Sequence, residues 1–347
     1  MNNMKALRLQ EVGKLEVQTV PLRELKDDEI LVKVGACGIC GSDIPRAFIS
    51  GAHKMPLTIG HEFSGEVVAV AAEKDNDLIG RKCAVFPLIP CGHCDSCQTG
   101  HFAQCRSYDY LGSRCDGGSA EYCIIPSRWQ LVLSNGGATY EELCMIEPAT
   151  VAQHAVRRSR LSGGEHIVII GAGPIGMLAA RWAEIFGARN ILLSEINADK
   201  IDFSRKLGFR TYNSAGEIQQ KVSEVTKGRG ADVIIEGTGT GAGLNAAIEM
   251  ANMFGRVVMM GNPSRDTTIS KAMHSQILRK ELTLQGVWNS IYAEPLNEWI
   301  YTAEMLDAGK LKTADLITHK ATLDQLPELF QGIYDRSITI CKAIYKA

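Results

Sequence analysis

The sequence predicts two domains, one β-rich and barrel-like and the other built on a doubly wound parallel α/β sheet. At 347 residues the chain is too long for one ordinary hydrophobic core and about right for two domains. Before residue 150, short strands alternate with glycine and proline, whereas beyond it strands alternate with helices. We therefore expect one domain over 1–152 and 291–347, and the second over 153–290.

The first domain begins with weakly alternating residues over 4–20, which predict two antiparallel strands joined at Gly13. Further short strands over 30–36, 63–71 and 82–86 are typical of a β-barrel. After the α/β domain, amphipathic helices over 299–306 and 326–334 precede a last strand over 340–345. Because the parallel sheet is complete without this tail, we expect the tail to return to the first domain.

Composition excludes several classes of function. The net charge of −2 argues against a nucleic acid or an anionic membrane as the main partner. No apolar run approaches the length of a membrane span, and the N-terminus has no apolar signal region, so we expect a cytoplasmic protein. The 11 cysteines are an odd number, and ten of them lie between Cys37 and Cys144, which does not suit a secreted disulfide framework.

The segment 88–108 carries the clearest metal signal. Its four cysteines have the spacing C-x2-C-x2-C-x7-C, and four thiolates form a closed tetrahedral site for a structural zinc. The alternatives are a disulfide cluster or buried thiols, but the tight spacing and polar surroundings favour zinc. The expected ligands are Cys91, Cys94, Cys97 and Cys105.

A second group of metal-binding residues is of a different kind. Cys40 lies on one predicted loop and the consecutive residues His61 and Glu62 on another, and three such ligands leave room for water or substrate, as a catalytic zinc requires. A single cysteine is usually a core residue, so the His61-Glu62 pair is what makes Cys40 a candidate ligand. Cys37 and Cys40 also form a C-x2-C pair, and spacing alone does not decide between them.

A dinucleotide motif, G-x-G-x-x-G, follows the predicted strand 166–170 and opens a helix. Its glycines permit a tight turn, the close approach of a pyrophosphate and the close packing of the helix against the strand. The free N–H groups at the helix N-terminus stabilise the negative charge of the phosphate. Glu195 ends the next strand, where a carboxylate bonds ribose hydroxyls and repels a 2′-phosphate, which favours NAD over NADP. The alternative is a structural glycine turn with a surface acid. The expected cofactor contacts are Gly171, Gly173, Pro174, Ile175, Gly176, Glu195 and Lys200.

Together these motifs resemble the zinc-dependent medium-chain dehydrogenases over essentially the whole chain, and within them the polyol branch, most closely its polyol phosphate dehydrogenases. This resemblance implies a Rossmann coenzyme domain, a GroES-like barrel carrying the catalytic residues, two zinc ions per chain and NAD. The segments that carry the closer likeness are 38–46, 51–53, 60–65, 108–114, 146–148 and 278–283.

The resemblance also implies roles for individual residues. The catalytic ligand of the family is the cysteine before Gly-Ser-Asp, here Cys40, and His61 is the second ligand. Glu147 stands where alcohol dehydrogenases have a second cysteine, as in polyol dehydrogenases, and Glu62 lies behind the metal and ligates it transiently. Exchange of a thiolate for a carboxylate replaces a soft ligand by a hard one, and a harder ligand set suits a hydroxyl-rich substrate that chelates zinc.

The chain departs from the family at the proton relay. Many alcohol dehydrogenases have a histidine five residues after the catalytic cysteine, whereas this chain has Pro45. Ser42 can still begin a proton relay, but the sequence does not identify the residue that follows it in the relay. His53 is one candidate, and a surface histidine is the alternative reading of that residue.

The expected function is a zinc- and NAD-dependent oxidation of a secondary alcohol of a polyol to the ketose, by a homodimer or homotetramer. A polyol phosphate such as galactitol 1-phosphate is the preferred substrate, with an unphosphorylated polyol or L-threonine as alternatives. A phosphate needs cations, for which Arg46, Lys54 and Arg114 are candidates unless they are solvated surface charges. The alternative from a different class is a non-catalytic nucleotide-binding protein of the same fold. In such a protein we would expect some zinc-ligand residues to be replaced, and none is replaced here.

Overall fold

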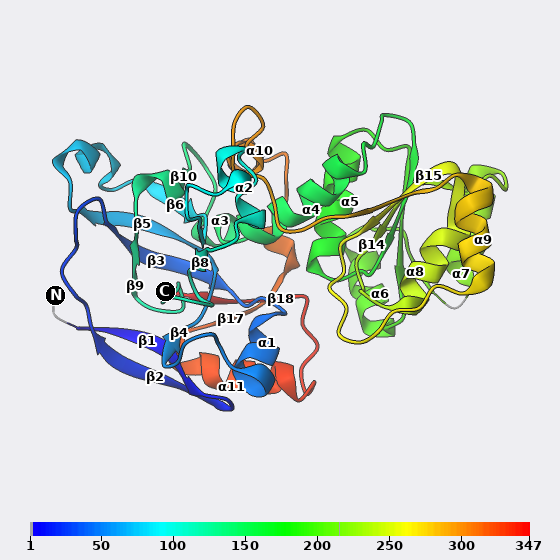
Figure 1. The fold of residues 1–347 in the computed structure, drawn as a ribbon. Helices are drawn as coiled ribbons and strands as arrows, with labels where there is room; N and C mark the ends of the chain where they lie inside the picture. The colour runs from blue at the N-terminus through cyan, green and yellow to red at the C-terminus, as the bar shows by residue number, and fades with distance from the viewer. Residues whose placement is uncertain (1–2, 215) are drawn as a thin grey trace. The chain divides into compact units, whose positions relative to one another are not determined.

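The computed structural model describes residues 3–214 and 216–347. The chain divides into two compact units, Met1–Glu147 with Ile291–Ala347, and Pro148–Ser290. The first unit consists mainly of strands, and the second surrounds a central sheet with helices (Figure 1). The predictions of a β-rich first domain and a doubly wound second domain are therefore confirmed.

The main sheet of the first unit has the strand order β10-β6-β5-β3-β18-β17, with β9 also paired to β3. The strands of this sheet are β3 (Ile30–Gly38), β5 (Glu62–Val70), β6 (Lys82–Val85), β9 (Tyr122–Ile125), β10 (Leu131–Leu133), β17 (Ile317–Ala321) and β18 (Lys342–Lys346). A smaller sheet, β2-β1-β4, consists of β1 (Asn3–Glu11), β2 (Lys14–Pro21) and β4 (Leu57–Thr58). The turn between β1 and β2 contains Gly13 at φ +82°, as the sequence predicted.

The C-terminal tail completes the first unit. Strand β18 pairs antiparallel with β3, and Tyr345 of β18 lies opposite Cys37. Helix α11 (Leu326–Tyr334) inserts Leu326 and Phe330 into the same hydrophobic core as Val32 of β3. The expected return of the tail to the first domain is thus confirmed, because burial of these apolar residues requires the barrel as a partner.

Short helical segments connect the strands of the first unit. Helix α3 begins with a capping box in which Thr139 and Glu142 satisfy each other's backbone N–H groups. The segments are α1 (Asp43–Pro45), the π-helical η1 (Arg46–Ser50), α2 (Asp95–Gln98), α3 (Tyr140–Leu143), α10 (Glu298–Asp307) and 3₁₀ turns at 73–78, 102–104, 128–130, 314–316 and 323–325. The pair α1 and η1 matters most for function, because it follows directly on Cys40.

The second unit contains a parallel sheet with the strand order β13-β12-β11-β14-β15-β16, which is the classic Rossmann order. Its strands are β11 (His166–Ile170), β12 (Asn190–Glu195), β13 (Thr211–Asn213), β14 (Ala231–Glu236), β15 (Ala251–Met259) and β16 (Thr283–Gly286). Its helices are α4 (Ile146–Arg158, which begins in the first unit), α5 (Pro174–Ile185), α6 (Ala198–Lys206), α7 (Glu217–Thr226), α8 (Gly241–Met250) and α9 (Lys271–Lys280).

Local sequence signals explain the boundaries of these elements. All five residues of β11 are buried, in keeping with a central parallel strand. The Asn197 side chain accepts a hydrogen bond from the backbone N–H of Lys200 at 3.0 Å and caps α6, and Gly208 lies beyond its end at φ +90°. Among the helices of residues 3–214 and 216–347, none combines the length and apolar character needed to span a bilayer.

Candidate metal and cofactor sites

The four cysteines of segment 88–108 converge on one point. Strands β7 (Leu88–Ile89) and β8 (Asp109–Tyr110) pair antiparallel and form the neck of the loop that carries these cysteines. All four sulfur atoms lie within 4.8 Å of one another and none is in a disulfide, so the disulfide alternative does not hold in this structure.

The sulfur positions also suit a tetrahedral metal. Cys94 Sγ lies 3.5 Å from Cys97 Sγ and 3.9 Å from Cys105 Sγ, and Cys91 Sγ lies 3.9 Å from Cys97 Sγ. A tetrahedron with zinc–sulfur distances of about 2.3 Å has edges of about 3.8 Å. The donor set therefore fits a closed zinc site.

Backbone N–H groups favour the thiolate form in this loop. Those of Arg106 and Cys97 lower the pKa of Cys94 to about 6, and that of His93 lowers the pKa of Cys91. Burial has the opposite effect on Cys97, whose pKa it raises to about 12. Because zinc binds thiolates, backbone N–H groups that lower the pKa of Cys91 and Cys94 favour metal binding by these two residues.

Cys40, His61 and Glu62 form a second group, in which one ligand atom from each residue lies within 4.8 Å of the others. The pairing of β3 with β5 brings them together, because Gly38 at the end of β3 lies opposite Glu62 at the start of β5. Cys40 and His61 are in the loops that adjoin these two strand ends. Cys37 is fully buried, with its Sγ 3.7 Å from Ser119 Oγ, and lies outside this group.

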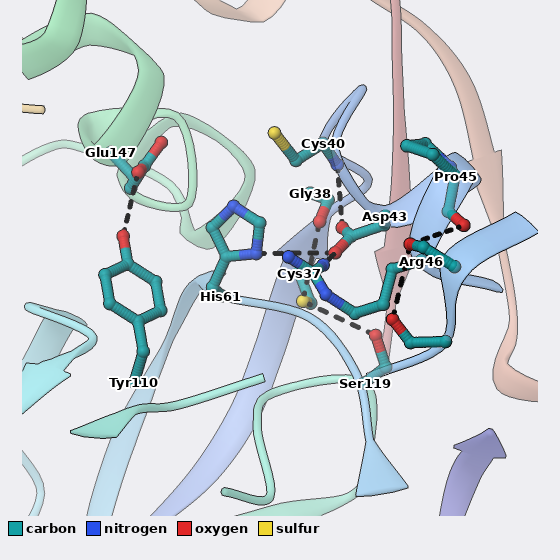
Figure 2. A network of polar contacts seen from close by, with 12 residues as sticks. Cys37, Gly38, Cys40, Asp43, Pro45, Arg46, His61, Tyr110, Ser119 and Glu147 are labelled. Carbon is teal, nitrogen blue, oxygen red and sulfur yellow. Dashed lines mark hydrogen bonds and ion pairs between the residues drawn. The ribbon is translucent and has the colours of Figure 1, made fainter. Parts of the chain in front are cut away.

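Glu147 lies near the same group, at the start of α4, and is buried (Figure 2). The Tyr110 hydroxyl donates a hydrogen bond to Glu147 Oε1 at 3.3 Å, and the Tyr110 ring meets the His61 ring edge-on at 5.7 Å. Burial raises the pKa of Glu147 to about 7, although the charge of His61 opposes this shift. Tyr110 therefore connects the residues His61 and Glu147, and sequence reasoning did not single it out.

Asp43 is a further residue without a predicted role, and it occupies the centre of the site in Figure 2. Its side chain is 1% exposed; Oδ2 accepts a hydrogen bond from Cys40 N at 3.0 Å, and Oδ1 lies 3.5 Å from His61 Nδ1. Burial alone would raise the pKa of Asp43, but His61 and Arg46 outweigh burial and hold it below its usual range. With Nδ1 directed to a carboxylate, Nε2 of His61 is the nitrogen suited to a metal.

Glu62 forms an ion pair with Lys342, and both side chains are almost completely buried. A Cβ atom at Gly38 would lie 2.1 Å from Glu62 Oε2 and 2.9 Å from Lys342 Cε, so glycine provides the space for this pair. Burial lowers the pKa of Lys342, but the charge of Glu62 outweighs this and raises it overall. No local pattern could indicate Lys342, because it lies on the last strand, far from Glu62 in the sequence.

The second unit brings the predicted dinucleotide residues together. Gly171 has φ +107°, and a Cβ at Gly176 would lie 1.9 Å from Gly171 O, so both positions require glycine. A Cβ at Gly173 would meet no atom within 4 Å, which leaves the backbone open to a phosphate. Pro174 and Ile175 form the first turn of α5.

Glu195 is held in place beside this turn. Its carboxylate accepts hydrogen bonds from the backbone N–H groups of Ala172 at 3.1 Å, Ile196 at 2.8 Å and Asn197 at 3.1 Å. The side chain thus has a defined position at the carboxyl end of β12, next to the glycine turn. The side chain of Lys200 is exposed on α6.

The remaining predicted residues fall in different settings. Ser42 is exposed before α1 and makes no side-chain capping bond, and His53 and Lys54 are exposed in the loop after η1. Arg46 forms an ion pair with Asp43. The Arg114 guanidinium lies over the Tyr108 ring, 4.3 Å from its centroid.

Two protein families match the sequence. Residues 26–135 match the alcohol dehydrogenase GroES-like domain, and residues 174–305 match the zinc-binding dehydrogenase family. The expectation of a GroES-like first domain is thereby confirmed.

Individual proteins resemble the chain over nearly its whole length. Galactitol 1-phosphate 5-dehydrogenase of Escherichia coli K12 is 34% identical over 92% of this chain and 94% of its own. Sorbitol dehydrogenase of Bacillus subtilis is 29% identical over 95% of this chain and 93% of its own. The crystal structure of galactitol-1-phosphate dehydrogenase from Escherichia coli superposes with a TM-score of 0.91 at 32% identity, covering 99% of this chain and 100% of the other. A zinc-binding dehydrogenase from Sinorhizobium meliloti 1021 bound to NADP has a TM-score of 0.90 at 29% identity, with both chains covered completely.

Proposed function

The chain belongs to the zinc-dependent medium-chain alcohol dehydrogenases, and on that premise we propose that it oxidises a secondary alcohol of a polyol phosphate with zinc and NAD. The family membership makes it an oxidoreductase. The observation that carries the proposal is the group of half-buried Cys40 with buried His61, Glu62 and the nearby Glu147. Tyr110 contacts Glu147, and Tyr108 contacts both Tyr110 and Arg114.

In the proposed site, Cys40, His61 and Glu147 would hold the catalytic zinc, and Glu62 would be a transient ligand. Zinc, when bound, lowers the pKa of a substrate hydroxyl so that its proton leaves near neutral pH. Asp43 orients His61 and the Cys40 backbone. The hydroxyl of Ser42, on the same loop, would accept the substrate proton at its Oγ while it releases its own proton to solvent, to which Ser42 is exposed. Four other thiolates, from Cys91, Cys94, Cys97 and Cys105, hold the structural zinc.

In the proposed cofactor site, the glycine turn and the N-terminus of α5 receive the pyrophosphate of NAD. The Glu195 carboxylate accepts hydrogen bonds from the ribose hydroxyls. Three backbone N–H groups already fix the position of this negative charge, and it would repel a 2′-phosphate. Although one relative was crystallised with NADP, this arrangement supports NAD as the preferred cofactor here.

Arg114 is the residue that best supports a phosphorylated substrate. It lies over Tyr108, whose ring meets the ring of Tyr110 at 6.4 Å, and Tyr110 in turn donates to Glu147. Within residues 3–214 and 216–347, Arg114 makes no ion pair with an acidic residue, so its guanidinium can donate hydrogen bonds to a phosphate. Arg46, by contrast, is paired with Asp43.

Lys54 is the second candidate for a phosphate contact. It is exposed in the loop after η1. An arginine and a lysine together would suit a phosphate dianion better than an uncharged polyol.

The test measures NADH formation with galactitol 1-phosphate, other polyol phosphates, the free polyols and L-threonine. We expect a phosphate ester to exceed the free polyol about a hundredfold in kcat/KM, which corresponds to about 2.7 kcal/mol. Arg114→Ala should remove most of this preference through KM and leave the free polyol unaffected. Arg106→Ala is the matched control, because Arg106 is 75% exposed and pairs with Asp95 on the cysteine loop.

A free polyol or L-threonine as the best substrate would contradict the phosphate assignment while the zinc and NAD assignments remained. The proposal also includes a cytoplasmic homodimer or homotetramer, and light scattering of the purified protein measures the number of chains directly.

A further inference from the structure

Arg46 pairs with a carboxylate that itself contacts two residues of the proposed zinc site. Asp43 Oδ2 accepts the Cys40 backbone N–H at 3.0 Å, and Asp43 Oδ1 faces both the Arg46 guanidinium and His61 Nδ1. Figure 2 shows the three contacts meeting at the one carboxylate. Cys40 follows β3 and His61 precedes β5, so this carboxylate adds a side-chain connection between two loops whose strands are paired.

The Asp43 carboxylate needs a positive partner, because its side chain is only 1% exposed. A buried carboxylate is tolerated when it is paired and fully hydrogen-bonded. Arg46 meets this need from three residues further along the chain, since α1 and η1 are helical and place positions i and i+3 on one face. Its own side chain is 18% exposed, so the pair is largely shielded from water.

We propose that Arg46 is a positioning residue of the catalytic zinc site, which acts through Asp43 on His61 and Cys40 and does not serve as a phosphate contact. The inference rests on the proposed zinc ligands. The planar guanidinium fixes the orientation of the Asp43 carboxylate, and this orientation fixes the His61 ring and the Cys40 backbone. Without Arg46, the carboxylate loses its cation and can rotate away from either ligand.

The first measurement is the rate at which the zinc-loaded protein releases metal to an excess of a chromophoric chelator at fixed pH. Two phases are expected, one for each site. Arg46→Gln should accelerate one phase by about tenfold or more and leave the other unchanged, in line with the effect of outer-shell substitutions on metal affinity. Arg46→Lys, which keeps the charge, should restore most of the slow release. Arg106→Gln, beside the four-cysteine site, should change neither phase.

Steady-state kinetics separate positioning from substrate contact. If Arg46 positions the ligands, Arg46→Gln lowers kcat by the same factor for phosphorylated and free alcohols. If Arg46 binds phosphate, KM rises for the phosphate ester alone and zinc release is unchanged, and this result would overturn the proposal.

A second variant keeps the test decisive if Arg46→Gln folds poorly. Asp43→Asn should accelerate the same phase of zinc release, and the double variant Asp43→Asn/Arg46→Gln should be no faster than Asp43→Asn alone, because Arg46 acts through Asp43. Effects that multiply would refute this coupling. A wild-type protein that binds a single zinc would instead refute the proposed function itself, so the two failures are distinguishable.

Discussion

Replacement of Lys342 by methionine tests the buried ion pair that Lys342 forms with Glu62. The two side chains are 4% and 2% exposed, so the substitution leaves a carboxylate in the core without its cation. Removal of one partner from a buried pair costs about 3–5 kcal/mol. For a unit of about 200 residues, 1 kcal/mol corresponds to about 2–4 °C in Tm, so we expect Tm to fall by about 6–20 °C.

Calorimetry of the zinc-loaded protein measures this change in the transition of the first unit. The double variant Glu62→Gln/Lys342→Met removes both charges and should recover most of the lost stability, to within about 2 kcal/mol of the wild type. Lys5→Met is the matched control, because Lys5 and Asp324 form an exposed pair in the same unit that should contribute at most about 1 kcal/mol.

Two results would refute this reasoning. A loss below about 1 kcal/mol in Lys342→Met would mean that water or another cation compensates Glu62. A double variant less stable than Lys342→Met would mean that the two side chains stabilise the unit by packing rather than by mutual charge.

Three further predictions concern other parts of the molecule. Cys97→Ser should lower the zinc content from about two to about one per chain by elemental analysis, since three thiolates no longer close the tetrahedron; an unchanged content would argue against the four-cysteine site. Glu195→Ala should reduce the ratio of kcat/KM for NAD to that for NADP by about tenfold or more, and an unaltered ratio would remove Glu195 from the cofactor site. The pKa of Glu141 lies below the ordinary range of a glutamate, chiefly because Lys346 donates a hydrogen bond to its carboxylate. The pair therefore stabilises the fold above the ordinary pKa, and this contribution disappears as the pH falls through the lower pKa of the folded state. The difference in the free energy of unfolding between wild type and Glu141→Gln, followed through Tm, should therefore be largest near neutral pH, at about 1 kcal/mol, and vanish in acid. A difference that grows in acid would contradict the predicted direction of the pH dependence.

Sequence alone determined the features that depend on neighbouring residues. The spacing from Cys91 to Cys105 allows a single loop to close on one metal, and the glycines from Gly171 to Gly176 permit a turn that few other residues adopt. The Asn197 cap and the Gly13 turn are likewise properties of a few consecutive residues. Such signals can be read directly because their geometry is set within one turn or loop.

The connections between distant segments emerged only in the tertiary structure. Lys342 reaches Glu62 across most of the chain, and Tyr110 meets Glu147 from the neck of the cysteine loop. Asp43 belongs to a motif that was evident in the sequence, but its place between Cys40 and His61 depends on the pairing of β3 with β5. Residue type and spacing predict which groups can bind a metal, whereas the folding of strands from both ends of the chain decides which buried charges face one another.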